Sequence, residues 1–210
     1  MSTRPPTPSP LDAESSASKS ERTRKRLLDA TAAVLASRGF AGSRLSDIAE
    51  QADVQTPAIY YYYSGREDLI EEVMRVGAST IRGHLEQTLA NLPPATPPSA
   101  RIAAAVEAHL RIELEISDYA KAIIRNANQL PEHLSRHALA EVTEYNEIWR
   151  GLITELAEAG QLREGIDPSV GRMIVLGALN WTAEWWRPDR GPLDELIATT
   201  QSMVLHALRP

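Results

Sequence analysis

Residues 45–69, with the sequence LSDIAEQADVQTPAIYYYYSGREDL, contain the pattern that decides the fold. Apolar side chains recur at spacings of three and four in residues 45–52, which predicts a short amphipathic helix. Asp53 opens a tight turn. A second short helix is expected to begin with Thr56 as its N-cap and with Pro57 in its first turn, where no amide hydrogen is needed. Two short helices joined by a tight turn predict a helix-turn-helix, whose second helix can enter the major groove of DNA.

The second helix of this pair presents a small or polar face. A major groove about 12 Å wide admits one helix, and the side chains that we expect to face it are Gln55, Thr56, Pro57, Ala58, Tyr60 and Tyr61. Ile59 and Tyr63 are expected to face inward, onto the preceding helices. Tyr62 and Arg66 are placed to hold phosphates, which sets the register on DNA without reading its sequence. The alternative for the four tyrosines is a packed aromatic cluster with no role in DNA binding.

Helical periodicity continues on both sides of this segment. A helix begins near Glu21 and ends at Gly39, which is free to adopt the left-handed backbone conformation of a C′ residue. A long helix opens at Gly65 or one residue earlier and ends near Leu89, and the four prolines of residues 91–99 mark a linker. Further helices are expected over residues 100–116, 118–128, 131–159, 168–186 and 192–208. Since no strand-like alternation of useful length is present, the expected fold class is all-α.

Composition divides the chain into parts. Residues 1–18 are rich in Pro, Ser and Thr and lack apolar periodicity, so we expect a disordered tail. Residues 1–66 carry nine Lys and Arg against seven Asp and Glu, whereas residues 67–210 carry thirteen against twenty-one, within a net charge of −6. A basic head on an acidic body is typical of a protein that contacts phosphates at one end, and chance surface patterning is the alternative. The expected domains are a three-helix DNA-binding domain over residues 19–66 and a larger helical domain over residues 67–210.

Composition and missing motifs exclude several classes of protein. The chain has no cysteine, which excludes disulfides, thiolate nucleophiles and cysteine-ligated metal sites. The first ten residues lack the pattern of a signal peptide, and residues 173–186, the most apolar stretch, are too short and too polar to span a bilayer. We therefore expect a cytoplasmic protein with no membrane partner. No Gly-rich phosphate loop or nucleophile elbow is present, so we expect neither catalysis nor a cofactor.

One row of side chains has the spacing of metal ligands. His133, His137 and Glu141 lie four residues apart on an expected helix, as helical metal ligands can. Most such pairs on a polar helix are solvated, and no cysteine or third histidine lies nearby. We therefore expect no metal site here.

The helix-turn-helix segment and its flanks resemble the TetR family of repressors. The resemblance lies in residues 26–30 (RLLDA), 38–40 (RGF), 46–49 (SDIA), 54 (V), 59–63 (IYYYY) and 66–69 (REDL). It implies a homodimer that binds double-stranded operator DNA and an effector pocket in the C-terminal domain. Residues 67–210 would then serve both effector binding and dimerisation.

The resemblance also implies roles for single positions. The family's phosphate-contacting tyrosine corresponds to Tyr60, its following aromatic residue to Tyr62, and the basic residue that opens its fourth helix to Arg66. This chain departs from the family at Arg44, where serine or threonine is usual and which becomes a spare phosphate contact. It departs again at Asp53, where glycine is usual and tolerates left-handed geometry better. The positions that reach bases in the family are Thr56, Pro57, Ala58 and Tyr61.

The C-terminal part contains an unusual concentration of tryptophan. Trp181 and Trp185 are four residues apart and share a helix face, and Trp149 lies on another helix, four residues after Tyr145. One interpretation is that these rings fill the core and a dimer interface. The other is an elongated apolar effector pocket with a few polar groups, to which we assign Arg125, Asn126, Asn128, Tyr145, Trp149, Trp181 and Trp185.

A second and less specific resemblance concerns the effector. Residues 122–126, 129–131, 177–181 and 186–188 resemble a TetR branch that controls fatty-acid or steroid side-product catabolism and that responds to acyl-CoA thioesters. A CoA thioester needs cations for its phosphates, and the candidates are Arg125, Arg150 and Arg187. The expected function is a repressor that binds a palindromic operator as a dimer and is released by such a small molecule. The alternative is a ligand-binding adaptor that no longer binds DNA.

The last two expected helices are candidates for the dimer interface. Their apolar rows exceed what one buried face needs, and the small residue Gly177 permits close approach of a symmetry mate. The rows consist of Met173, Ile174, Leu176, Gly177 and Leu179 in the first helix and of Leu196, Met203 and Leu208 in the second.

Overall fold

The computed structural model describes residues 10–126 and 129–210, and every regular element in those ranges is helical. This confirms the all-α fold class. The elements are α1 (Pro10–Gly42), α2 (Leu45–Gln51), α3 (Thr56–Ile59), α4 (Arg66–Ala90), α5 (Pro98–Arg111), the π-helical turn η1 (Ile112–Ile116), α6 (Asp118–Asn126), α7 (Glu132–Glu158), α8 (Pro168–Trp185), the 3-10 turn η2 (Pro188–Arg190) and α9 (Leu193–Leu208).

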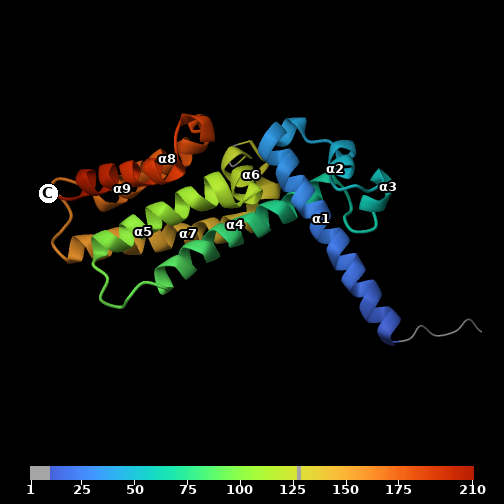
Figure 1. Ribbon diagram of the computed structural model, residues 1–210, viewed down its shortest axis with the longest axis horizontal. Coiled ribbons are helices and arrows are strands. Elements are labelled where there is room, and N and C mark those ends of the chain that lie inside the picture. Colours follow the sequence, from blue (N-terminus) through green and yellow to red (C-terminus); the bar gives the residue numbers. More distant parts are fainter. Residues whose placement is uncertain (1–9, 127–128) are drawn as a thin grey trace, which may run out of the picture.

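The helices form an elongated molecule with a small head at one end (Figure 1). The head consists of α1, α2 and α3. The body consists of α5, α7, α8 and α9, which run along the length of the molecule toward the C-terminus at the opposite end. Helix α4 joins the two parts, because it contacts α1 of the head, α6, and α5 and α7 of the body.

The head has an apolar core of its own. Leu27, Ile48 and Ile59 place one fully buried side chain from each of its three helices against Leu69 of α4. Each such burial contributes about 1.5–3 kcal/mol, so this cluster fixes the angle between α2 and α3. Ile59 and Tyr63 were predicted to face inward, and their exposed fractions of 0% and 4% confirm this.

This core extends well past residue 66 along α4. It includes α4 as far as Ala78 and Ile123 of α6. An added Cβ at Gly77 would lie 2.8 Å from the end of the Ile123 side chain and 3.1 Å from the carbonyl oxygen of Tyr119, so glycine favours this close approach of α4 and α6. The head is therefore packed directly onto α6.

A second apolar core fills the body. Trp149 of α7 is fully buried there, together with apolar side chains from α4, α5, α8 and α9. A buried tryptophan contributes a large apolar surface, so Trp149 is a principal structural residue of this domain. For Trp149, this location favours the interpretation that its ring fills the core.

Helix α1 differs from its expected extent at one end and agrees at the other. It begins at Pro10, within the range expected to be a tail, and residues 1–9 lie outside the described part of the chain. Proline suits a first helical turn, because its missing amide hydrogen is not needed there. Near its other end the helix bends at Gly39, whose φ of 70° confirms the predicted left-handed conformation.

Candidate functional site

The turn between α2 and α3 has one left-handed residue. Asp53 has a φ of 53°, and it is the single non-glycine residue with a positive φ in residues 10–126 and 129–210. Aspartate tolerates this conformation better than most side chains, which explains why it can replace a glycine at this position. The turn is closed by the amide of Val54, which donates to the carbonyl of Ala49 at 3.0 Å.

Helix α3 is shorter than expected and begins one residue earlier. Gln55, not Thr56, is its N-cap, and the helix ends at Ile59. The Thr56 prediction was wrong because Gln55 has the extended backbone of a cap residue, with a φ of −76° and a ψ of 140°, and Pro57 still falls in the first turn. Tyr60 and Tyr61 consequently lie in the turn that follows the helix rather than on the helix itself.

The predicted DNA-contacting side chains gather at the exposed end of the head. Tyr60 is 59% exposed and Tyr61 is 81% exposed, an unusual state for large aromatic rings. Tyr62 is half-buried and packs edge-on against Tyr61, with ring centroids 5.1 Å apart. The tyrosines are thus divided between the core and the surface rather than forming one packed cluster. The other exposed members of the predicted set are Arg44, Gln55, Pro57 and Ala58, with Thr56 half-buried.

Arg66 has a structural environment that the sequence did not predict. Its Nε donates to the carbonyl of Ser43 at 2.5 Å, and its terminal nitrogen donates to the carbonyl of Phe40. Its guanidinium also lies 4.4 Å from the centroid of the Phe40 ring. The side chain therefore fixes the segment between α1 and α2, and these donors are occupied within the protein.

Two adjacent residues of α6 hold the end of α1. Arg125 donates from one terminal nitrogen to the carbonyl of Ala36 at 2.7 Å and to that of Ser37 at 3.0 Å. The Asn126 carboxamide is fully buried and accepts from the amide of Phe40 at 2.7 Å. These bonds satisfy backbone groups at the bend in α1, where the helix leaves them without intrahelical partners.

The body contains a cavity of about 520 Å³ between α4, α5, α6, α7 and α8. This volume lies within the range of sites for small molecules. Part of the wall is apolar, and the rest carries groups that can donate or accept hydrogen bonds. Its apolar lining includes Ala78, Ile81, Ile123, Val142, Leu176 and Trp181, and its polar lining includes His109, Arg125, Gln129, Tyr145, Asn180 and Glu184.

Three of the predicted ligand-binding residues, Arg125, Tyr145 and Trp181, line this cavity. Asn126 and Trp149 do not line it: the first bonds to α1 and the second lies in the core of the body. Trp185 is 39% exposed and is also absent from the cavity wall. Asn128 lies outside the described residues. The periodicity of a helix identifies side chains that share a face, but it does not identify what that face meets.

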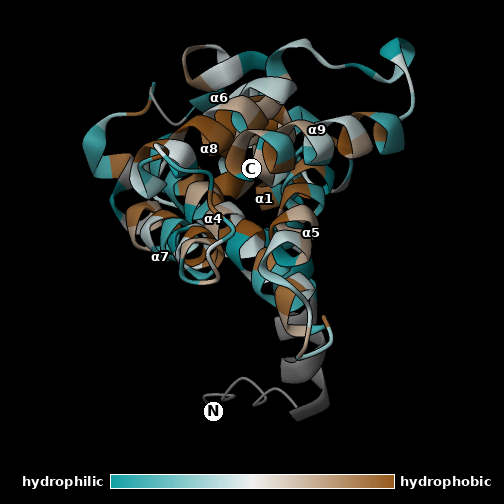
Figure 2. Cartoon of the chain, turned by 90° about the vertical axis from the view of Figure 1, so that its left-hand side faces the viewer, coloured by the Kyte–Doolittle hydropathy of each residue, from teal (hydrophilic) through white to brown (hydrophobic). Residues whose placement is uncertain are grey.

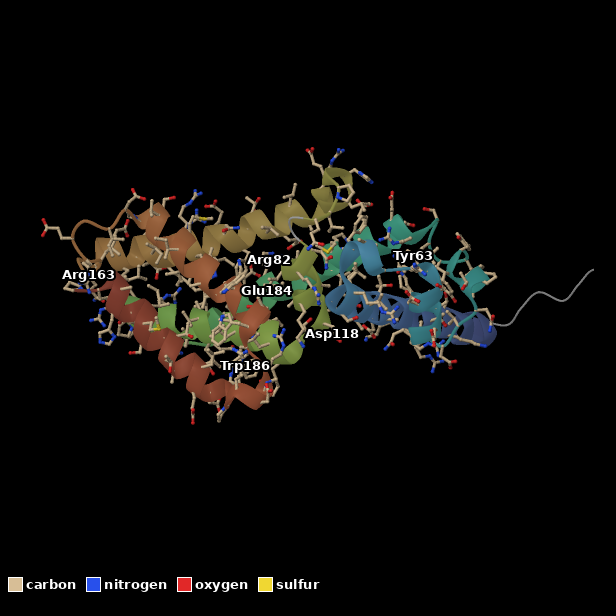
Figure 3. The ribbon with its side chains drawn as sticks, turned by 90° about the horizontal axis from the view of Figure 1, so that it is seen from above. Tyr63, Arg82, Asp118, Arg163, Glu184 and Trp186 are labelled. Carbon is tan, nitrogen blue, oxygen red and sulfur yellow. The ribbon has the colours of Figure 1, made fainter. Side chains whose placement is uncertain are left out.

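A second cavity of about 350 Å³ lies next to the first and shares Arg125 and Glu184 with it. Lys121 and Arg187 also line it, so three cations line one space together with the carboxyl groups of Glu113 and Glu184. Figure 3 shows Glu184 and Trp186 near the middle of the long axis, between Tyr63 in the head and Arg163 at the far end. Of the predicted phosphate-binding cations, Arg125 and Arg187 therefore lie together. Arg150 lies apart from them, in a smaller cavity with Asp167 and Arg172.

Sequence reasoning missed Lys121, His109 and Glu184 as cavity residues. Lys121 is a single lysine on an amphipathic helix, where the usual expectation is a solvated surface charge. His109 lies in a run of apolar residues in α5 and is 4% exposed. A histidine within an apolar run of a helix was the one local signal in the sequence that could have indicated His109 as a cavity residue.

Helix α8 leaves an apolar stripe exposed. The stripe consists of Val170, Met173, Ile174, Gly177, Trp181 and Trp185, which recur at spacings of three and four. Much of α8 is coloured hydrophobic in Figure 2. Met203 of α9 is 69% exposed as well. Leu176, Leu179 and Leu208 were predicted to lie in the dimer interface, but they are buried in the core of the body, because they occupy the opposite faces of the two helices.

Two of the three side chains with metal-ligand spacing, His133 and Glu141, lie beside side chains of opposite charge. His133 lies 3.4 Å from the carboxylate of Glu67, and Glu141 is paired with Arg82 at 2.6 Å. Within the described residues no group of three or more candidate ligands is placed to hold a metal ion. None of the described helices combines the length and apolar character needed to cross a lipid bilayer.

Comparison with known proteins agrees with this arrangement. Residues 27–73 match the family model described as bacterial regulatory proteins, tetR family, and residues 95–208 match a tetracyclin repressor-like C-terminal domain. The chain is 25% identical over 205 residues to the HTH-type transcriptional repressor KstR2 of Rhodococcus jostii, covering 95% of this chain and 97% of that protein. It is 25% identical over 181 residues to the fatty acid metabolism regulator protein of Bacillus subtilis, covering 85% and 90%.

The fold also matches solved structures over nearly its whole length. The structure of AibR in complex with isovaleryl coenzyme A and operator DNA has a TM-score of 0.78 at 20% identity, and the match covers 90% of this chain and 99% of that one. The C-terminal family model alone spans more than half of the chain, and the N-terminal model spans the helix-turn-helix. The chain therefore belongs to the TetR family of bacterial regulatory proteins.

Proposed function

We propose that this protein is a dimeric repressor that binds a palindromic operator through α2 and α3 and is released by an acyl-CoA thioester. The observation that carries the proposal is the position of Arg125, which lines both cavities and also donates to the two carbonyls that precede the bend in α1. An anionic ligand competes for this guanidinium. Ligand binding is thereby coupled to the helix that supports the head.

Each of the two cavities binds a different part of such a ligand. The larger one, with its apolar wall, suits an acyl group, and the smaller one, with Lys121, Arg125 and Arg187, suits the phosphates of CoA. The shared residues Arg125 and Glu184 mark where the two meet. A relative of the same fold that holds isovaleryl coenzyme A and operator DNA supports this class of effector.

The proposed dimer forms through the exposed stripe of α8 together with Met203 of α9. Exposed apolar side chains at helical spacing on two neighbouring helices fit a four-helix bundle with a symmetry mate. Two α3 helices must then lie about 34 Å apart to enter successive major grooves. An effector that favours a different spacing lowers operator affinity by shifting the population away from the bound state.

The proposal is tested by fluorescence anisotropy with the DNA upstream of the protein's own gene and with a scrambled duplex. We expect a salt-sensitive complex that favours the upstream DNA and that octanoyl-CoA or isovaleryl-CoA releases, whereas free CoA and free octanoate do not. A protein that binds these thioesters but forms no sequence-selective complex is a ligand-binding adaptor. A selective complex that no acyl-CoA releases rejects the effector class.

A double variant tests the placement of the CoA phosphates. The combined substitutions Lys121→Ala and Arg187→Ala should weaken the binding of octanoyl-CoA by about tenfold or more, since each charge-assisted hydrogen bond contributes about 1.5–3 kcal/mol. Octanoyl-pantetheine lacks the nucleotide phosphates of CoA, so the double variant should bind it as the unaltered protein does. Arg190→Ala, which removes a nearby cation that does not line the cavity, is the matched control.

A further inference from the structure

The larger cavity opens on the exposed stripe of α8. Gly177 and Trp181 belong to this stripe and also line the cavity. Trp181 is 64% exposed, so it borders both the cavity and the solvent. Val142 of α7, another residue of the cavity wall, is 38% exposed. These three residues form the rim of an opening between α7 and α8, which we call the mouth of the cavity.

Apolar surface surrounds the mouth on both helices. Along α7 it continues to Leu139, which lies three residues before Val142 and is 50% exposed. Along α8 it continues to Ile174, which lies three residues before Gly177 and is 66% exposed. Contiguous apolar surface of this kind is unfavourable in water and marks a place that a partner covers.

The direction of α8 makes a second copy of the chain the fitting partner. Two heads must reach one DNA duplex, so the two-fold axis of a DNA-bound dimer runs from the heads toward the far end of the molecule. Helix α8 runs along the length of the body in the same direction (Figure 1). Two copies that meet along the stripe therefore keep both heads at one end.

The closest approach of the two copies falls at the mouth. The stripe extends from Val170 to Trp185, and Gly177 lies near its middle. An added Cβ at Gly177 meets no atom within 4 Å among the described residues, so the position is open in the single chain. Since glycine lets another backbone approach more closely than any other residue does, the two α8 helices come closest beside the rim.

We propose that the partner subunit's α8 closes the mouth of the larger cavity, so that the effector site is complete only in the dimer. This inference rests on the proposed function, to which it adds that the acyl group contacts both subunits. The CoA phosphates lie at the other end of the ligand, in the cavity that Lys121 and Arg187 line. Effector binding and dimerisation then strengthen each other, because coupling between two binding events is reciprocal. The effector consequently releases the operator from an intact dimer.

Closure is tested first without a ligand, by the reactivity of a thiol at the mouth. The chain has no cysteine, so one introduced cysteine is labelled alone. Val142→Cys places it on the rim but on α7, outside the stripe, and Ile174→Glu yields the monomer by charging a stripe residue outside the cavity lining. Fluorescein maleimide should label Val142→Cys at least about tenfold more slowly in the dimer than in the Ile174→Glu background, since labelling of the dimer requires the interface to open.

Controls separate closure from other effects on labelling. Glu144→Cys places an exposed thiol on the opposite face of α7 and should react equally in dimer and monomer. Met173→Glu, at another exposed stripe residue outside the cavity lining, supplies the monomer if Ile174→Glu fails to fold. Equal labelling of Val142→Cys in dimer and monomer overturns the inference, and so does sedimentation velocity that shows a dimer for both charged variants.

Octanoyl-CoA tests the coupling to the effector. Isothermal titration calorimetry should show at least about fivefold weaker binding to the folded Ile174→Glu monomer than to the dimer, because the acyl group loses the apolar surface of the partner. Octanoyl-CoA should also lower the dissociation constant of the unaltered dimer in sedimentation velocity, whereas free CoA, which lacks the acyl group, should not. Equal affinity for monomer and dimer overturns the inference. If octanoyl-CoA binds neither protein, the proposed acyl-CoA function is rejected instead, and the labelling alone decides whether the partner closes the cavity.

Discussion

Single side chains in the head have roles that their position in the motif does not reveal. Arg66 and Arg44 are both cations at the DNA-facing end, yet Arg66 is bonded to the carbonyls of Ser43 and Phe40 while Arg44 is exposed. Hydrogen bonds from a charged donor contribute about 1.5–3 kcal/mol each. The two arginines are therefore expected to respond differently to truncation.

Arg66→Ala should lower the free energy of unfolding by about 2 kcal/mol, measured by urea denaturation, because two carbonyls lose their donor. Arg66→Lys should recover only part of this, since an ammonium cannot reproduce the fork of a guanidinium. Arg44→Ala is the matched comparison: it should leave stability unchanged, weaken operator and scrambled DNA alike and flatten the salt slope by about one unit. If Arg66→Ala left the free energy of unfolding unchanged and flattened the salt dependence of DNA binding, Arg66 would be a phosphate contact instead.

Tyr60 is exposed and carries no charge, so removing its hydroxyl should affect DNA binding differently from removing the charge of Arg44. Tyr60→Phe should weaken operator and scrambled DNA by a similar factor of about threefold to tenfold, which is the effect of one neutral hydrogen bond to a phosphate. The salt slope should stay the same because no cation is lost. A loss limited to the operator would show that this hydroxyl reads a base, and the comparison is made by anisotropy titration at two salt concentrations.

Between elements, the joint of α1 with α6 is the connection through which the cavity can act on the head. Gly39 bends α1, Asn126 binds the amide of Phe40, and Arg125 binds the two carbonyls that precede the bend. Arg125 reaches this joint from the cavity wall. Helix α6 is therefore the element whose displacement would be felt by both parts.

Asn126→Ala should be strongly destabilising for its size. It removes the acceptor of the Phe40 amide and the donor to the carbonyls of Leu35 and Ala122, all at a fully buried position. Buried groups left without a partner cost about 1–3 kcal/mol each, so we expect a loss of at least about 2 kcal/mol in chemical denaturation. Asn146→Ala, at a half-buried position on α7, is the control and should change stability far less. Equal small losses in both would mean that the joint contributes little.

For the whole molecule, the exposed stripe of α8 predicts the assembly. Gly177 lies on this stripe, and an added Cβ there meets no atom within 4 Å, so a larger side chain does not disturb the single chain. Gly177→Glu should therefore keep the fold, place a charge in the dimer interface and yield a monomer with weakened operator binding. Gly151→Glu on α7, also in open space, is the matched control and should remain a dimer. Sedimentation velocity that shows a dimer for both would place the interface elsewhere.

The sequence by itself determined the class of the fold and the identity of the head. The pattern of residues 45–69 is local: spacings of three and four decide which side chains of a short helix turn inward, and Ile59 and Tyr63 do so as expected. Gly39 and Asp53 were also readable, because a left-handed residue is restricted to few side chains wherever it occurs. These features, the inward faces of short helices and the left-handed residues, depend on contacts within a few residues along the chain.

Only the tertiary structure decided the contents of the cavities. Trp149 and Trp181 both lie within helical patterns, yet one fills the core and the other lies at the cavity and on the exposed stripe of α8. Lys121 and Arg187 meet across one space, although sixty-six positions separate them in the sequence. Helical periodicity fixes which residues share a face, but the partner of that face depends on how distant helices pack, and that packing places Val142 and Trp181 at the mouth of one cavity.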